Sequence, residues 1–152
     1  MTSALTLVNT TPRFDLPLLY AAQAQKEVVA NESFALTDAL LHCAIEGTAA
    51  TPPASPANGA NWLVATGASG AWAGQDGNIA CQQNGNWVFV TPRDGLQVLN
   101  RTNGQWQHYY GSWKAPAAPT APTGGTTVDD VARSAINALI AALKTAGIFS
   151  AS

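Results

Sequence analysis

The stretch Ile79-Ala-Cys-Gln-Gln-Asn-Gly-Asn-Trp-Val-Phe89 decides how the central part of this chain folds. Two short, mainly apolar runs flank Asn84-Gly85. A two-residue type I′ turn needs a positive φ at both central positions, and Asn-Gly adopts that geometry readily. The stretch therefore predicts an antiparallel β-hairpin with Asn84 and Gly85 at its tip.

Similar signals surround this hairpin from residue 61 to residue 114. Turn residues divide the segment into short apolar runs, and Asn103-Gly104 repeats the hairpin signal. The expected strands are 61–66, 78–83, 87–91, 95–100 and 105–110. We therefore expect residues 61–114 to form a small, antiparallel, Trp-rich β domain, as a meander or a barrel-like sheet.

The chain before this domain divides into three parts. Residues 1–20 contain Pro12 and Pro17 and have no helical period, which predicts an extended N-terminal arm. Residues 21–47 are rich in Ala, Gln, Lys and Glu, which predicts a helical segment. Residues 48–60 read as a Pro-rich loop.

The predicted helical segment carries its own apolar stripe. Leu36, Leu40 and Cys43 recur at spacings of four and three. Asn31 favours a helix cap over a helix interior, so we expect an interruption there. The stripe needs a covering surface, and we assign Leu36 and Leu40 to contacts between copies of the chain.

After the β domain, residues 115–127 form a Pro-, Thr- and Gly-rich linker, and residues 128–147 read as a C-terminal helix. Thr127 is the expected N-cap, and Asp129 and Asp130 suit the first turn because the helix dipole favours negative charge there. Together these elements predict the α+β class.

The C-terminal helix has an apolar stripe that suits self-association. Its residues are Ala132, Ile136, Leu139, Ile140 and Leu143. A helix of this length on a flexible linker is marginal alone, so identical helices from other copies are its expected cover. The alternative is that the helix folds back on the β domain.

Composition also favours assembly. Charged residues make up 11% of the chain and the net charge is -2, against a usual charged share of about 25%. Clustered Lys and Arg are missing, which argues against binding of nucleic acid. The N-terminus does not resemble a signal peptide, and we expect no membrane insertion because no stretch approaches the roughly 20 apolar residues that span a bilayer.

Catalytic chemistry has few candidates in this sequence. His42 and His108 have no partner at ligand spacing, and Asp76 and Asp94 lie in expected turns. We expect no enzyme activity, metal or cofactor. Cys43 and Cys81 read as small buried hydrophobes, with a disulfide between them as the alternative.

Aromatic residues concentrate in the expected β domain. Trp72, Trp87 and Trp106 each follow a glycine by two residues, which suits indoles packed as a core. Exposed aromatic rings can instead stack on sugar faces. The candidate glycan contacts are Trp72, Trp106, Tyr109 and Trp113.

Six segments carry a resemblance to a known family. They are Thr11-Pro-Arg-Phe-Asp-Leu-Pro-Leu-Leu-Tyr-Ala-Ala-Gln-Ala-Gln-Lys-Glu-Val-Val-Ala-Asn-Glu32, Asp38-Ala39-Leu40, Pro52-Pro53-Ala54-Ser55-Pro56, Gly59-Ala60-Asn61-Trp62-Leu63-Val64, Gly70-Ala71-Trp72-Ala73-Gly74 and Thr91-Pro92-Arg93-Asp94-Gly95. In these segments the chain resembles proteins of alphaproteobacterial phages, prophages and gene transfer agents, long catalogued as a domain of unknown function. The C-terminal helix is similar to the terminal helix that follows this domain in phage fibre proteins.

The resemblance implies a virion component made in the host cytoplasm. Its expected place is a head spike, a fibre or a tail-fibre base that supports attachment to bacterial surface polysaccharide. The expected partners are other copies of the chain, with a trimer favoured, and a capsid, neck or tail protein bound through the N-terminal arm. A carbohydrate-binding module that uses the Trp-rich sheet is the alternative function.

Overall fold

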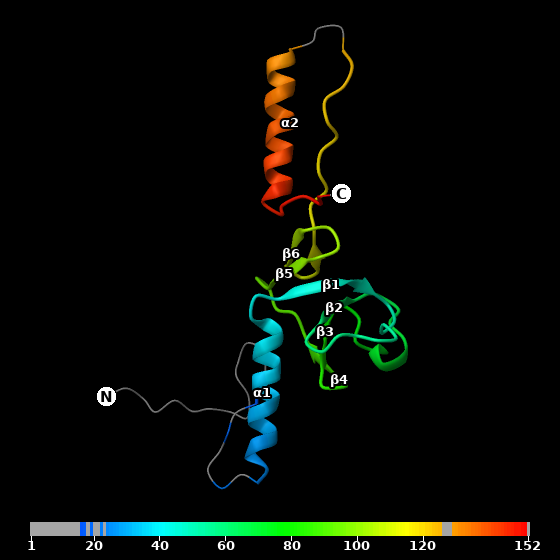
Figure 1. Cartoon of the computed structure of the whole chain (residues 1–152), viewed down its shortest axis with the longest axis vertical. Coiled ribbons are helices and arrows are strands. Elements are labelled where there is room, and N and C mark those ends of the chain that lie inside the picture. Colours follow the sequence, from blue (N-terminus) through cyan, green and yellow to red (C-terminus); the bar gives the residue numbers. More distant parts are fainter. Residues whose placement is uncertain (1–15, 18, 20–21, 23, 126–128, 152) are drawn as a thin grey trace, which may run out of the picture.

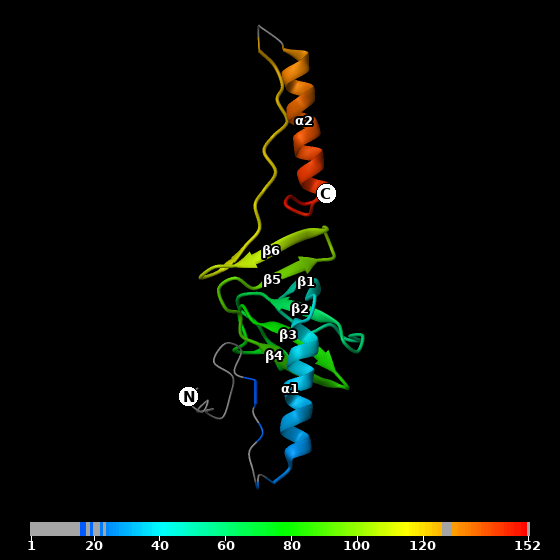
Figure 2. The same ribbon diagram turned by 90° about the vertical axis from the view of Figure 1, so that its left-hand side faces the viewer.

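The computed structural model describes residues 16–17, 19, 22, 24–125 and 129–151. Helix α1 (Lys26–Leu40), a β-sheet and helix α2 (Asp130–Thr145) follow one another along an elongated molecule. The two helices project from opposite ends of it (Figures 1 and 2). Most of the predicted arm, residues 1–20, lies outside the described residues.

The centre of the molecule is one seven-stranded sheet with the strand order β4-β3-β2-β1-β5-β6-β7. Its strands are β1 (Ala44–Ala49), β2 (Asn61–Val64), β3 (Ile79–Gln83), β4 (Asn86–Val90), β5 (Gln97–Asn100), β6 (Gln105–Tyr109) and β7 (Trp113–Lys114), with a 3-10 turn, η1 (Gly70–Trp72), between β2 and β3. The α+β class is confirmed. The sheet is mixed, so the prediction of a purely antiparallel meander or barrel is wrong: β1 runs parallel to both of its neighbours, β2 and β5.

Strand β1 comes from the segment that was predicted to continue the N-terminal helix. Helix α1 ends at Leu40, Leu41 is extended, and His42 has a φ of 50°. The next residues enter the middle of the sheet, where Ile45 pairs with Asn61 on one side and with Asn100 on the other. Strand pairing on both sides satisfies the backbone groups as completely as a helix would, and it also buries Ile45 fully.

The start of α1 also differs from the prediction. The helix begins at Lys26, after Gln25 in a left-handed conformation, and it runs through Asn31 without a break. The hydroxyl of Ser33 donates to the carbonyl of Pro17 at 2.6 Å, which ties the described end of the arm to the helix.

The hairpin prediction at Asn84-Gly85 is confirmed. These two residues alone join β3 to β4, with φ values of 50° and 86°. The second hairpin also forms, between β5 and β6, but its turn spans residues 101–104, and within Asn103-Gly104 only Gly104 has a positive φ.

The core is divided between the two faces of the sheet. On one face, Leu36 and Leu40 of α1 pack against a buried cluster that includes Ile45, Ile79 and Val98. On the other face, Trp62, Trp72 and Trp87 pack together with ring centroids 5.0–6.3 Å apart. Three of the five indoles therefore form a second core, as expected of aromatic clusters on one face of a sheet.

Local stereochemistry sets both ends of α2. The N-cap is Asp129, whose carboxylate accepts a hydrogen bond from the backbone N–H of Ala132 at 2.9 Å. The predicted N-cap, Thr127, lies outside the described residues. Gly147 has a φ of 73° just after the helix, and the N–H of Ile148 donates to the carbonyl of Leu143 at 2.9 Å. This is the glycine-terminated helix end that Gly147 predicts.

Candidate interaction surfaces

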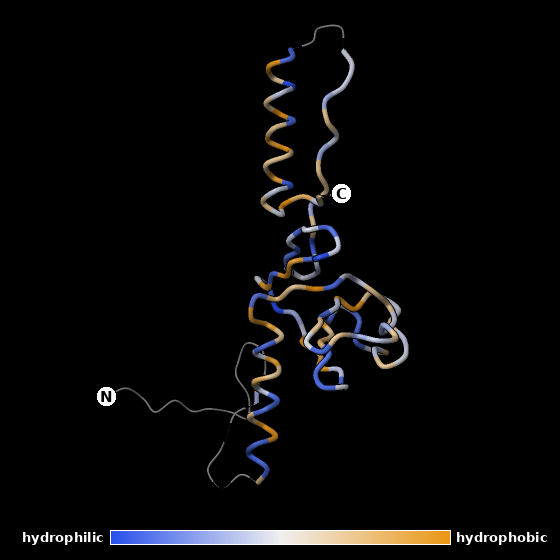
Figure 3. The backbone as a smooth tube through the Cα atoms, viewed as in Figure 1, coloured by the Kyte–Doolittle hydropathy of each residue, from blue (hydrophilic) through white to orange (hydrophobic). Residues whose placement is uncertain are grey.

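The apolar stripe of α2 is exposed. No residue of this helix is buried, and the side chains of Ile136 and Leu139 are 44% and 60% exposed. Figure 3 shows apolar turns recurring along the helix. Ala132 is also exposed, whereas Ile140 and Leu143 are half-buried. All five predicted self-association residues of the tail thus lie on one helix that the sheet does not cover.

The linker covers α2 only in part. Residues 115–125 leave the sheet in an extended conformation and run beside the helix (Figures 1 and 2). A guanidinium N–H of Arg133 donates to the carbonyl of Gly124. The linker and α2 together form an outgoing and returning arm, which we call the stalk.

The base of the stalk is clasped to the sheet. Gln105 is 4% exposed, and its Nε2 donates to the carbonyl of Pro116 at 2.6 Å and to that of Ile148 at 2.9 Å. The side chain of Gln105 therefore binds both Pro116, where the linker leaves the sheet, and Ile148, where the chain returns to the sheet. The backbone N–H of Ala151 adds a third bond, to the carbonyl of Asn103 at 2.9 Å.

Gly147 lets the returning chain reach β6. The backbone N–H of Trp106 donates to the carbonyl of Gly147 at 2.7 Å. A Cβ atom at position 147 would lie 2.7 Å from Cδ1 of Trp106 and 3.0 Å from the carbonyl oxygen of Gly104. Only glycine fits at position 147. The contact gives the backbone N–H of Trp106, at the outer edge of β6, a hydrogen-bond acceptor.

Sequence reasoning missed Gln105 and the contact at Gly147. Alternation along β6 offered a weak signal, because Gln105 lies on the inward side of a strand whose next residue, Trp106, points outward. A buried amide needs partners, but nothing local identified them as Pro116 and Ile148.

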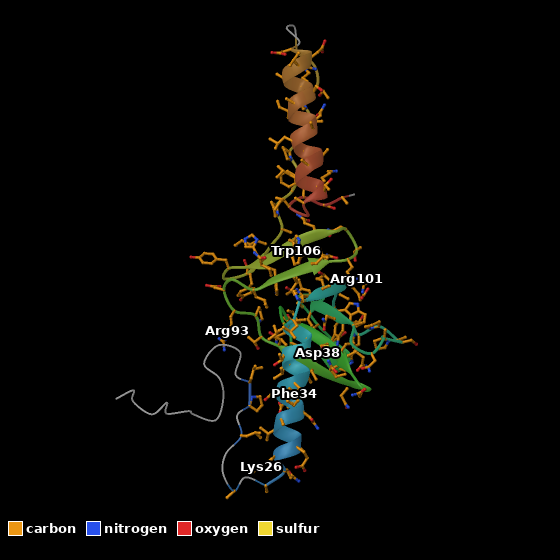
Figure 4. The ribbon with its side chains drawn as sticks, turned by 60° about the vertical axis from the view of Figure 1, so that its left-hand side comes forward. Lys26, Phe34, Asp38, Arg93, Arg101 and Trp106 are labelled. Carbon is orange, nitrogen blue, oxygen red and sulfur yellow. The ribbon has the colours of Figure 1, made fainter. Side chains whose placement is uncertain are left out.

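On α1, the predicted self-association residues have a different role. Leu36 and Leu40 pack against the core of their own chain. They are therefore reassigned from contacts between copies to intrachain packing, because the sheet supplies the covering surface. The outer side of α1 exposes Phe34, which Figure 4 labels midway along the helix.

The four candidate glycan contacts fall into three environments. Trp72 is fully buried in the second core, so it offers no ring face to a ligand, and its assignment as a contact is wrong. Trp106 is 41% exposed and lies on β6 near the base of α2 (Figure 4). Tyr109 and Trp113 form a perpendicular ring pair with centroids 5.4 Å apart.

Tyr109 and Trp113 line an open groove of about 520 Å³. The Nε1 of Trp113 donates to the carbonyl of Gly77 at 2.8 Å, which holds the indole in place. The other residues that line the groove are Thr48, Leu63, Val64, Ala65, Thr66, Asp76, Gly77, Gly111 and Ser112. The groove combines a fixed aromatic wall, an apolar floor and several hydroxyl groups.

The carboxylate of Asp76 is held at the rim of this groove. Its two oxygens accept hydrogen bonds from the backbone N–H groups of Gly67 and Ala68, at 2.9 and 3.0 Å. These bonds favour the charged form and lower the pKa of Asp76 below its ordinary value. Asp76 therefore presents a fixed negative charge.

A second, more polar cavity of about 380 Å³ lies near the end of α1. Its lining includes Asp38, His42, Asn61 and the ion pair between Glu46 and Arg101, whose atoms are 2.6 Å apart. Figure 4 labels Asp38 and Arg101. Exposed pairs of this kind contribute at most about 1 kcal/mol, so the pair mainly links β1 to the turn after β5.

Cysteines and clusters of metal-ligating side chains are the remaining places where chemistry could occur in the described part of the chain. Among them, no group of three or more His, Cys, Asp or Glu side chains could hold a metal ion. Cys43 and Cys81 are free and buried, which corrects the disulfide alternative. Burial raises the pKa of both thiols, that of Cys43 to about 11, so both stay protonated near neutral pH.

A protein-family model matches the central part of the chain. Residues 30–114 match the family described as "Protein of unknown function (DUF2793)". The chain belongs to the DUF2793 family. No curated protein matches the chain.

The DUF2793 match covers the sheet but not the stalk. It begins at Ala30, within α1, and ends at Lys114, the last residue of β7. All seven strands therefore belong to the family domain. The linker and α2 follow it, and no helix among the described residues is long and apolar enough to cross a membrane.

Proposed function

We propose that this DUF2793 protein is a non-enzymatic structural subunit of a phage or phage-like particle, which assembles with copies of itself through α2. The exposed apolar stripe of the stalk carries the proposal. The particle type rests on the sequence resemblance, with a head spike, a fibre or a tail-fibre base as the place of the subunit.

The physical support is the cost of leaving this stripe in water. Most of the stability of a helix in a protein comes from packing of its apolar face, and burying one large aliphatic side chain stabilises a structure by about 1.5–3 kcal/mol. Ile136 and Leu139 recur with Ala132 and Leu143 at the spacing of a helical bundle. Matching helices of other copies cover such a stripe, and a trimer suits a spike or fibre.

The shape of the subunit also suits this role. The stalk projects away from the sheet at one end, and α1 lies at the other end (Figures 1 and 2). Assembly through the stalk leaves the arm free to bind a capsid, neck or tail protein. We expect deletion of residues 1–20 to preserve the oligomer and to prevent incorporation into particles.

Light scattering on a dilution series tests the assembly step. The wild-type chain is expected to form a closed oligomer, and Leu139→Glu is expected to be monomeric because it places a charge in the seam. Ser134→Glu is the matched control, since it adds the same charge to the same helix away from the stripe. A monomeric wild-type chain, or a Leu139→Glu variant that assembles normally, would contradict the proposal.

A second candidate function is binding of bacterial surface polysaccharide, and the groove beside Tyr109 and Trp113 favours it. Sugar faces stack on aromatic rings, while sugar hydroxyls bind carboxylate and hydroxyl groups. The groove offers both kinds of group, with Asp76 at its rim. It retains Tyr109 and Trp113 from the predicted glycan contacts and leaves out the buried Trp72.

NMR titration with capsular oligosaccharides tests this second function. Shifts are expected at the Trp113 indole N–H and at Gly77, and Trp113→Ala is expected to weaken binding at least tenfold. Arg101→Ala, outside the groove, is expected to bind normally. No shifts at millimolar oligosaccharide, or equal weakening by both variants, would rule out the groove.

A further inference from the structure

Exposed apolar residues occur both on α2 and at the place where the chain returns from α2 to the sheet. Ile136 and Leu139 on the helix, Ile148 just after it and Trp106 on β6 are all exposed large hydrophobic residues. Trp106 and Ile148 are held close to each other by Gln105. This residue precedes Trp106 in the chain, and its side-chain Nε2 donates to the carbonyl of Ile148.

A small cavity marks the place where the helix surface meets the sheet. It has a volume of about 180 Å³ and is lined by Gln97, Trp106, Gln107, His108, Pro116 and Ile148. None of these is a carboxylate, a lysine or an arginine. The residues from 115 to 128 add no charged side chain. An uncharged surface of this kind on a stalk base is typical of contacts between protein subunits.

We propose that a second copy of this chain covers Trp106 and Ile148, in a parallel arrangement in which the interface runs without a break from α2 onto β6. The proposal rests on the self-assembly proposed above and extends it. It assigns Trp106 to an interface between copies rather than to a glycan.

The parallel arrangement is the one that brings the residues at the base of neighbouring stalks together. The stalk base is fixed to the end of α2, so parallel helices bring the bases of neighbouring copies together. A helix of 16 residues is about 24 Å long at about 1.5 Å per residue. Antiparallel helices would hold the bases about that far apart and leave each Trp106 beside the distal end of a partner helix, where Asp129 and Asp130 lie.

A substitution at the base tests the extended interface. Trp106→Arg is expected to raise the dissociation constant of the oligomer at least tenfold, as loss of a central aromatic contact does. Tyr110→Arg is the matched control, because Tyr110 is 68% exposed just after the far end of β6 and does not line the cavity. Circular dichroism checks that both variants remain folded.

Cysteine cross-linking tests the arrangement. Ala146→Cys lies on the stripe next to the base, and Ala132→Cys lies on the same stripe at the distal end. Parallel packing predicts that each single variant forms disulfide-linked dimers on oxidation. Cross-links that form only in a mixture of the two variants indicate antiparallel packing and overturn the proposal. The wild-type chain controls for Cys43 and Cys81.

The outcomes separate this inference from the assembly proposal. A wild-type chain that stays monomeric at all concentrations overturns both. An oligomer that Leu139→Glu disrupts and Trp106→Arg leaves intact overturns only the extension onto β6. Protection of Trp106 from iodide quenching by an oligosaccharide, but not by assembly, also overturns it and assigns the indole to the glycan.

Discussion

The side-chain Nε2 of Gln105 lies 2.9 Å from the carbonyl oxygen of Ile148, and this bond joins the central sheet to the segment that follows α2. The same nitrogen lies 2.6 Å from the carbonyl oxygen of Pro116. Because Gln105 is buried, these two bonds are shielded from water. Loss of the Gln105 amide would remove this hydrogen-bond donor from the carbonyls of both Pro116 and Ile148. With the backbone bonds from Trp106 to Gly147 and from Ala151 to Asn103, this amide fixes the base of the stalk on the sheet.

Gln105→Leu is expected to release the base of the stalk without unfolding the sheet. Removing one partner from a buried hydrogen bond costs about 1–3 kcal/mol. The amide of Ala151, which binds the carbonyl of Asn103, should therefore exchange with deuterium roughly tenfold faster or more. Gln97→Leu is the control, at an exposed position on the neighbouring strand. Equal exchange of the Ala151 amide in both variants would show that the side chain of Gln105 does not hold the stalk.

Gly147→Ala is expected to weaken the same contact for a different reason. The added Cβ meets the Trp106 ring at 2.7 Å, and the φ of 73° is unfavourable for alanine. Gly124→Ala separates the two effects, because Gly124 has the same φ and no atom within 4 Å of an added Cβ. Faster exchange at the Trp106 amide in Gly147→Ala alone identifies the close packing as the cause. Similar exchange in both variants would assign the effect to backbone strain.

Trp72→Ala is expected to destabilise the family domain strongly. Its indole is fully buried between Trp62 and Trp87, and large-to-small changes at such aromatic sites cost about 3–5 kcal/mol. Urea denaturation measures the change, with Tyr110→Ala as an exposed control expected within about 0.5 kcal/mol of wild type. A loss below about 1 kcal/mol would contradict the burial of Trp72.

Asp76 is expected to make stability fall in acid. Its pKa is lowered on folding by the bonds from Gly67 and Ala68, so the unfolded chain binds the proton more readily. The stabilising effect is present above the unfolded pKa and is lost as the pH falls through the lower folded pKa.

Urea midpoints between pH 2 and pH 6 measure this effect. Asp76→Asn should be less stable than wild type at pH 6, and the difference should shrink toward pH 2. Glu32→Gln removes one negative charge from the exposed side of α1 and controls for the loss of charge alone. A constant difference between wild type and Asp76→Asn across the range would refute the role of Asp76.

The local features of the fold could be predicted because neighbouring residues determine them. The turn at Asn84-Gly85 and the helix end at Gly147 depend on positive φ values that these residue types tolerate. The stripe of α2 follows from helical spacing alone. In the candidate site, the apolar stripe was therefore predictable, whereas its exposure and the clasp at Gln105 were not.

Residues 41–49 show where local patterns fail. The segment carries residues that suit either a helix or a strand, and the structure makes it the central strand because β2 and β5 supply ladders on both sides. The Ile45 pairings with Asn61 and Asn100 join residues far apart in the sequence. A turn at His42 then separates α1 from the sheet.

The sequence by itself determined the α+β class, the first hairpin, the two helices and the apolar stripe of α2, because each depends on residues within a few turns of one another. Only the tertiary structure decided that β1 lies in the middle of a mixed sheet, that Trp72 is core, that Leu36 and Leu40 cover their own sheet, and that Gln105 clasps the stalk. Each of those depends on groups brought together from distant parts of the chain, where burial and hydrogen-bond partners, not local propensity, set the lowest free energy.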